Sequence, residues 1–189
     1  MKIAILGGRF DPPHIGHYLI AKQVLELRPD IDKVLFVPAS QHQWKPIIAL
    51  PTDRIEMLKS FLEPKIEISE IEIKRGGISY SIDTVEEIKK QTNAKIFWIV
   101  GSDIVSEFHR WKNVDNLLKL ATFLVIPRDP HALPAEIPAG FEVIRSPKLL
   151  TTNFSSTAIR EKIKNGESIR YLVPEKVEEY IKEHKLYAA

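Results

Sequence analysis

The chain of 189 residues contains no cysteine, which excludes a disulfide framework and a thiol nucleophile. It has no apolar run approaching the about 18 residues of a transmembrane helix and no signal-peptide pattern, so we expect a cytoplasmic protein with no membrane partner. The chain also lacks a large excess of charge of either sign: it has 27 Lys and Arg residues and 25 Asp and Glu residues, for a formal net charge of +2. This balance argues against a nucleic-acid partner, and any anion must be bound locally.

Short apolar runs alternate with amphipathic stretches along the chain. Strands are predicted at 2–6, 33–37, 66–73, 95–100, 122–126 and 142–144. Helices are predicted after Pro13 to about 27, and at about 51–62, 81–91, 114–120, 155–164 and 174–184, with Thr52 and Ser81 as caps. The alternation predicts an α/β protein with a Rossmann-like, doubly wound parallel sheet and C-terminal helices. We expect one domain over 1–189, with a helical C-terminal part at about 155–189.

The transition from the first strand to the first helix carries an unusual motif. It reads Gly7-Gly8-Arg9-Phe10-Asp11-Pro12-Pro13-His14-Ile15-Gly16-His17. Glycines let backbone amides approach a polyanion, and the new helix presents its unpaired N–H groups and positive dipole end there. His14 and His17 are three residues apart, so both can reach one group. A tight turn or a zinc site is the alternative, but the other histidines show no ligand spacing; we predict a phosphate site and no protein metal site.

A second motif, Ser155-Ser156-Thr157-Ala158-Ile159-Arg160, begins a helix far along the chain. Its hydroxyl groups would also suit simple helix capping. Arg160 adds a guanidinium group that can fork onto phosphate oxygens in the first helical turn. Asp103 lies at the carboxyl end of a central strand, the edge at which open α/β sheets bind ligands. Two phosphate-binding helix ends in one sheet suggest a polyphosphate, and a triphosphate is the simplest candidate.

These motifs together resemble the nucleotidyltransferase superfamily of adenylyl and cytidylyl transferases, and most closely its bacterial nicotinate mononucleotide adenylyltransferases. The resemblance covers nearly the whole chain, apart from the loop at about 129–140. Besides the two motifs above, it rests on these segments: Gln43-Trp44-Lys45-Pro46, Arg54, Ser79-Tyr80-Ser81-Ile82-Asp83-Thr84, Gly101-Ser102-Asp103, Trp111-Lys112, Ile126-Pro127-Arg128 and the tail from Tyr171 to Tyr187.

The resemblance implies adenylyl transfer from ATP to nicotinate mononucleotide, giving nicotinate adenine dinucleotide and pyrophosphate in NAD biosynthesis. It implies ATP and this nucleotide as partners and Mg²⁺ bound with ATP; a homo-oligomer is left open. By resemblance the catalytic residues are His14, His17, Lys45 and Arg160. The implied ATP site comprises Gly7, Gly8, Arg9, Phe10, His14, His17, Gly101, Asp103, Ser155, Ser156 and Arg160. The implied pyridine-nucleotide site comprises Asp11, Lys45, Thr84, Trp111 and Arg128, with the Trp111 indole stacking on the ring and Trp98 left to the core.

Arg9 departs from the bacterial pattern, which usually has serine or threonine there, and resembles archaeal nicotinamide mononucleotide adenylyltransferases instead. Nicotinamide mononucleotide is therefore an alternative acceptor. Another superfamily enzyme, of the pantetheine-phosphate or cytidylyl type, is a second alternative. A non-catalytic nucleotide-binding sensor on the same fold is a third, because fold does not determine function. The literal His-Ile-Gly-His also resembles class I aminoacyl-tRNA synthetases, but the chain is far too short and lacks a basic surface for tRNA.

Overall fold

The computed structural model describes residues 1–128, 131 and 133–188. Its centre is a parallel sheet of six strands in the order β3-β2-β1-β4-β5-β6. The strands are β1 (Lys2–Gly8), β2 (Lys33–Pro38), β3 (Ile66–Ile68), β4 (Lys95–Gly101), β5 (Ala121–Ile126) and β6 (Phe141–Val143). This is the strand order of a doubly wound nucleotide-binding sheet, so the predicted fold class is confirmed.

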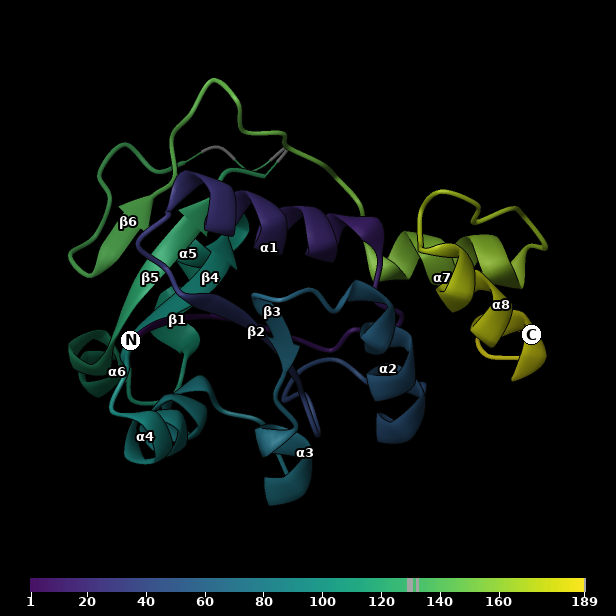
Figure 1. The fold of residues 1–189 in the computed structure, drawn as a ribbon, viewed down its shortest axis with the longest axis horizontal. Coiled ribbons are helices and arrows are strands. Elements are labelled where there is room, and N and C mark those ends of the chain that lie inside the picture. Colours follow the sequence, from purple (N-terminus) through teal and green to yellow (C-terminus); the bar gives the residue numbers. More distant parts are fainter. Residues whose placement is uncertain (129–130, 132, 189) are drawn as a thin grey trace.

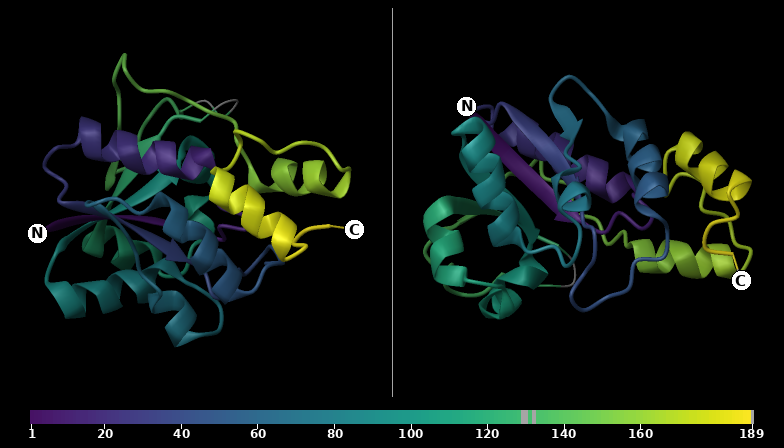
Figure 2. Two further views of the ribbon diagram at one scale, coloured as in Figure 1. Left: turned by 45° about the vertical axis from the view of Figure 1, so that its right-hand side comes forward. Right: turned by 90° about the horizontal axis from the view of Figure 1, so that it is seen from below.

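Helices cover both faces of the sheet, with α1 on one face and α4 and α6 on the other, while α7 and α8 lie together at one end of the molecule (Figures 1 and 2). The helices are α1 (Ile15–Leu27), α2 (Pro51–Leu58), α3 (Ile71–Arg75), α4 (Ser81–Thr92), α5 (Ser102–Glu107), α6 (Val114–Leu120), α7 (Ser156–Lys164) and α8 (Glu175–Glu183). Short 3₁₀ turns, η1 (Lys59–Phe61) and η2 (Phe108–Arg110), extend α2 and α5.

Two hydrophobic cores form because the central strands bury side chains on both faces. In β4, Phe97 and Ile99 point into the core beneath α1 and α8, whereas Ile96, Trp98 and Val100 point into the core beneath α4 and α6. Successive side chains of a strand alternate between faces, so a continuous apolar run is what a strand covered on both sides requires. The interpretation of Trp98 as a core residue is confirmed by its burial.

Several local predictions were wrong, and each for a physical reason. The strand predicted at 66–73 pairs with β2 only over Ile66–Ile68; the chain then turns into α3, which buries Ile71 and Glu72. Thr52 does not cap α2, because the helix already begins at Pro51 and Leu50 takes the cap position. The amide of Leu50 donates to the carboxylate of Asp53 at 3.2 Å. Ser81 does not cap α4, which follows Tyr80 without a side-chain cap.

Helix α5 was not predicted, since it is short and follows directly after β4. Of the loop expected at about 129–140, residues 129–130 and 132 lie outside the described residues. None of the helices in the described residues combines the length and apolar character needed to cross a bilayer.

The order in which the strands are added reverses at one place in the sheet, between β1 and β4. From β1 the strand order runs to β2 and β3 on one side, and from β4 to β5 and β6 on the other. At such a switch point the connections leave toward opposite faces, which opens a crevice at the carboxyl ends of the two strands. Gly8 ends β1 and Gly101 ends β4, so both glycine-containing motifs are brought to the edge where a ligand is expected.

Candidate active site

A continuous crevice follows the carboxyl edge of the sheet. Its central cavity, of about 310 Å³, has walls from Gly8, His17, Asp103 and Trp111. At one side it shares His17, Gly101 and Arg128 with a cavity that reaches His14 and Phe154. At the other side it shares His42, Ser79 and Trp111 with a cavity that reaches Trp44 and Lys112. The histidine motif and the expected pyridine pocket therefore belong to one hollow.

The two histidines of the first motif lie against each other at the start of α1. Their ring centroids are 3.7 Å apart in a stacked arrangement. The backbone amide of His14 donates to Nδ1 of His17 at 3.1 Å, so this nitrogen is an acceptor and the proton of the neutral ring resides on Nε2. Nδ1 of His14 is buried and has no hydrogen-bond partner within the described residues. The two rings thus lie side by side at the start of α1, and His17 has an N–H donor at Nε2; that both histidines reach one bound group stays a prediction.

Burial keeps both histidines neutral. Desolvation, aided by the nearby Arg128 charge, lowers the pKa of His14 from 6.5 to about 3. The pKa of His17 also falls well below 6.5, first through desolvation and then through repulsion by His14 and Arg128. A neutral imidazole in this position can donate a hydrogen bond to an anion, and a phosphate bound beside it would raise its pKa. The pair therefore suits a site where negative charge arrives with the ligand.

Helix α7 joins this site from far along the chain. Ser155 caps the helix by accepting from the amide of Ala158 at 3.2 Å, as its sequence suggested. The Ser156 hydroxyl donates to the carbonyl of Pro12 at 2.8 Å. Arg160 donates to the carbonyl of Asp11 at 2.6 Å. The two predicted phosphate-binding motifs are thus in direct contact, and Arg160 lies beside the glycine-containing loop.

Asp11 is at the centre of this junction and is completely buried. Its carboxylate accepts from the amides of Ile48 and Ala49 at 2.7 and 3.0 Å, and from the hydroxyl of Tyr187 at 2.9 Å. The prediction that Asp11 contacts a pyridine nucleotide is not favoured by this arrangement, because its oxygens already bind protein donors. Asp11 instead joins three distant segments of the chain.

The remaining residues of the first motif divide between crevice and core. Gly7 and Gly8 line the crevice. Gly7 is also needed for packing, because a Cβ atom there would lie 2.7 Å from the indole of Trp98. The Phe10 side chain, expected at the ATP site, is buried behind His17 with ring centroids 4.8 Å apart, so only its backbone is available to a ligand. Arg9 donates to the carbonyl of Pro46 at 3.1 Å and remains partly exposed.

The end of β4 supplies an acidic group to the same crevice. Gly101 precedes α5, and Asp103 lies in its first turn. Oδ1 of Asp103 is buried without a hydrogen-bond partner in the described part of the chain, while Oδ2 lies 3.8 Å from Nη1 of Arg128. Arg128 also donates to the carbonyl of Phe154 at 3.0 Å, which fixes its guanidinium between β5 and the approach to α7. Asp103 lines the central cavity, where a carboxylate suits a hydroxyl donor such as a ribose.

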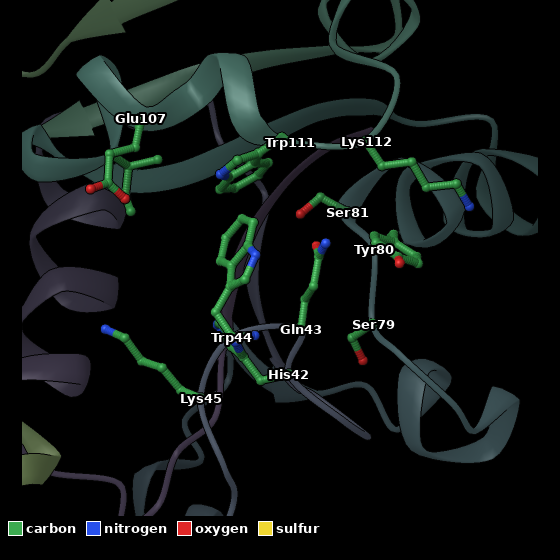
Figure 3. A pocket seen from close by; sticks show the side chains of 11 residues that line it. His42, Gln43, Trp44, Lys45, Ser79, Tyr80, Ser81, Glu107, Trp111 and Lys112 are labelled. Carbon is green, nitrogen blue, oxygen red and sulfur yellow. Dashed lines mark hydrogen bonds between the residues drawn. The ribbon is translucent and has the colours of Figure 1, made fainter.

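The far end of the crevice is aromatic. Figure 3 shows Trp44, from the segment after β2, pointing toward Trp111, which lies on the opposite wall. Trp111 packs edge-on against Trp98 at 6.2 Å and beside Phe108 at 5.2 Å between ring centroids, so its orientation is fixed. Lys45 lines this pocket as well. Aromatic walls suit a planar ring, and the nearby ammonium group of Lys45 suits a negatively charged substituent on it.

Thr84 lies below this pocket and not at its wall. Its side chain is fully buried, donates to Oε1 of Glu72 at 2.6 Å and accepts from Arg75 at 2.9 Å. Burial raises the pKa of the Glu72 carboxyl group. Direct contact between Thr84 and a nucleotide is therefore not favoured; Thr84 instead holds Glu72, which lines the central cavity.

The sequence motifs included Trp44, Tyr80 and Lys112 without assigning them to the site, and His42 and Glu107 were not assigned either; all five line the pocket. An aromatic residue in a polar loop directly after the carboxyl end of a strand was the available signal for Trp44. Lys112 forms an ion pair with Asp83 at 3.1 Å and lies over the ring of Tyr80, at 4.5 Å from its centroid. The pocket wall thus combines charge and aromatic surface from α4 and from the segment after α5.

Fold and site together define a nucleotide-binding α/β protein with paired histidines at the sheet's switch point. Residues 5–162 match the family model described as cytidylyltransferase-like. A Hydrogenobaculum sp. protein named "Probable nicotinate-nucleotide adenylyltransferase" is 40% identical, covering 100% of this chain and 99% of the relative. A Synechococcus sp. protein of the same name is 38% identical over 98% of this chain and 96% of the relative. The chain belongs to the nicotinate-nucleotide adenylyltransferases of the cytidylyltransferase-like family.

Solved structures agree with the fold. The Plasmodium falciparum nicotinic acid mononucleotide adenylyltransferase complexed with NaAD has a TM-score of 0.85 at 20% identity, covering 98% of this chain and 97% of that chain. The same enzyme complexed with APC has a TM-score of 0.84. At this identity the likeness establishes the architecture, and the family assignment rests on the sequence relatives.

Proposed function

We propose that this protein transfers the adenylyl group of ATP to nicotinate mononucleotide, releasing pyrophosphate. The observation that carries the proposal is the single crevice that runs from the histidine pair to the pocket between Trp44 and Trp111. It offers a phosphate end and an aromatic end, as a reaction between a triphosphate and an aromatic nucleotide requires. The names of the sequence relatives support the same substrates.

In this proposal the chain acts by positioning and by neutralising charge. An oxygen of the acceptor's 5′-phosphate attacks the α-phosphorus of ATP, and the bond to the bridging oxygen breaks as pyrophosphate leaves. Nε2–H of His17 donates to the phosphate oxygens on which charge develops, and the stacked His14 shares this task. Arg160 and Ser156, at the start of α7, bind the β- and γ-phosphates, while Lys45 supplies a cation from the opposite wall. No covalent nucleophile is required.

The acceptor end explains selectivity by shape and charge. The indole of Trp111 stacks on the pyridine ring, and Lys45, which lines the same pocket, supplies positive charge for a carboxylate. The carboxylate of Asp103, which lines the central cavity, accepts from a ribose hydroxyl group. Arg128, which is paired with Asp103, lies between the two ends of the crevice and can reach the acceptor phosphate.

Mg²⁺ enters as part of the substrate, bound to the phosphates of ATP and to water. The described residues include no group of three His, Cys, Asp or Glu side chains placed to hold a metal ion by themselves. Mg²⁺ bound with ATP would neutralise phosphate charge and make pyrophosphate a better leaving group. A cytoplasmic location and a homo-oligomer remain predictions.

The experiment is a comparison of acceptors. Pyrophosphate release is measured with Mg-ATP and, in separate reactions, nicotinate mononucleotide, nicotinamide mononucleotide or phosphopantetheine, with the dinucleotide identified by mass. Preferred turnover with the nicotinate compound is expected. Preference for the nicotinamide compound would replace the proposed acceptor by its amide analogue, and turnover with neither pyridine nucleotide would refute the proposal. The His17→Ala protein, purified in parallel, controls for a contaminating enzyme.

A further inference from the structure

The segment 41–50, which we call the pocket segment, forms one wall of the aromatic pocket. His42, Gln43, Trp44 and Lys45 all line that pocket. The segment contains neither a helix nor a sheet strand, so its position depends on how it is held. At its start, the amide of Ser40 donates to Oγ of Ser79, and the amide of Ser79 donates to the carbonyl of Gln41, both at 2.9 Å. These bonds tie the start of the segment to the chain before α4.

The end of the pocket segment is held in a different way, by carboxylates. The amides of Ile48 and Ala49 donate to Asp11, and the next amide, that of Leu50, donates to Asp53. Three successive backbone donors are thus bound by two acidic side chains. The side chains of Ile48 and Leu50 are exposed, 59% and 66%, and only the small Ala49 between them packs into the core. Apolar packing therefore contributes little side-chain area to this turn, and the carboxylates supply the hydrogen bonds that hold its backbone.

Each of these carboxylates is in turn bound by a tyrosine of the C-terminal tail. The hydroxyl of Tyr187 donates to Oδ1 of Asp11 at 2.9 Å, across 176 positions of sequence. The hydroxyl of Tyr180, on α8, donates to Oδ1 of Asp53 at 3.0 Å. Tyr187 is buried, and burial together with the Asp11 charge raises its pKa far above 10, so it remains a donor. We call these two tyrosine–aspartate pairs the C-terminal clamp.

We propose that the C-terminal clamp is a positioning device for the acceptor: Tyr180 and Tyr187 orient Asp53 and Asp11, which set the pocket segment against Trp111. None of its four side chains needs to touch a substrate. The expected effect on acceptor affinity rests on the proposed function, whereas the expected effect on the position of the pocket segment does not. It gives the tail, whose apolar residues pack in the core beneath α1, a role in substrate affinity beyond stability.

The test uses the full chain with Tyr187→Phe, Tyr180→Phe and the double variant, each of which removes one hydroxyl and keeps the ring. Tyr171→Phe is the matched control, since Tyr171 also lies near the C-terminus but is 77% exposed and outside the clamp. One readout is amide hydrogen exchange over 48–50. The other is the set of steady-state constants for acceptor and ATP.

Loss of one hydrogen bond to a charged group predicts about a five- to tenfold rise in the KM for the acceptor in each single variant, with a larger rise in the double variant. The KM for ATP and kcat should change far less, and exchange over 48–50 should accelerate. Tyr171→Phe should match the parent in every readout. Parental exchange in both single variants would overturn the clamp.

Faster exchange with an unchanged acceptor KM would reduce the clamp to a stabilising contact and overturn the positioning role. If the parent protein does not turn over, the proposed function fails, while exchange over 48–50 still decides whether the clamp holds the segment. Thermal unfolding shows whether a variant is folded. Should Tyr187→Phe not fold, Tyr180→Phe tests the same segment through the Leu50 amide alone.

Discussion

The backbone amide of His14 donates to Nδ1 of His17, and this one bond determines which nitrogen of His17 faces the crevice as a donor. Because an amide N–H cannot accept, the imidazole must place its proton on Nε2 when neutral. In metal sites, a hydrogen bond at one ring nitrogen of a histidine orients the other nitrogen toward the metal. Here the bond at Nδ1 has the same effect, with the phosphate site in place of the metal. Position and tautomer are thus fixed by the first turn of α1 itself.

Replacing His17 by alanine should lower kcat by about a hundredfold or more, because a preorganised donor to the transition state is worth about that much. Steady-state pyrophosphate release, with saturating ATP and acceptor, measures the loss. The control is His109→Ala, in which an exposed histidine outside the crevice is removed. A His17→Ala protein that turns over at the parental rate would contradict the assigned role.

Trp111→Phe and Trp111→Ala should raise the KM for the pyridine nucleotide, the alanine variant more strongly. An indole in contact with an aromatic ring contributes about 0.5–1.5 kcal/mol beyond buried area, or about a two- to tenfold change in affinity. Titration of acceptor at saturating ATP gives the constant. Trp111 also packs on Phe108, so the phenylalanine variant separates stacking from unfolding. A selective loss of ATP affinity would argue against stacking.

Stability should fall on acidification through the histidine pair. In the folded protein the pKa of His14 is about 3 and that of His17 is also lowered, whereas both return to 6.5 in the unfolded chain. The unfolded state therefore binds more protons below pH 6.5, and the free energy of unfolding decreases from there toward pH 3, by up to about 1.4 kcal/mol per pH unit for each histidine.

Urea unfolding at several pH values measures this slope in the absence of nucleotide. Replacement of both histidines by glutamine should flatten it over that range. A slope unchanged by the double replacement would show that other groups cause the acid sensitivity.

Gly7→Ala should destabilise the fold by about 1–3 kcal/mol, the usual cost of overpacking a filled core. The added methyl group would meet the Trp98 ring at 2.7 Å, and that ring is itself buried. Gly8→Ala is the matched control for stability, because the nearest atoms there, at 3.4 Å, belong to the Phe10 ring. Chemical denaturation compares the two. Equal stability of both variants would mean that Trp98 moves aside at no cost.

The sequence predicted the fold well where burial on both faces leaves a continuous apolar run, as in β4, or where a glycine ends a strand, as in β1. It failed at 66–73, because alternating isoleucine and glutamate suits an edge strand and also suits a short helix that buries one side. Pairing with the partner strand β2 decides between them, and this pairing ends at Ile68, after which the chain turns into α3.

The candidate site was predictable in its phosphate half, because strand, glycines, histidines and helix are adjacent in the sequence. Asp11 and Thr84 could not be placed, since an acidic or hydroxyl side chain gives no sign of whether it binds a ligand or a protein amide. Their partners, Tyr187 and Glu72, are determined by tertiary packing. Trp44 could not be assigned to the site either, because only the folded structure places it across the pocket from Trp111.

The three tryptophans of the chain, Trp44, Trp98 and Trp111, all line the crevice. Tryptophan fluorescence, excited at a wavelength that tyrosine does not absorb, therefore comes from the ligand site alone. Quenching by a bound pyridine ring gives a label-free signal for acceptor binding, and Trp44→Phe separates the contribution of the pocket segment from that of the two tryptophans on the sheet side. The arrangement that shapes the pocket thus also makes its occupancy visible in real time.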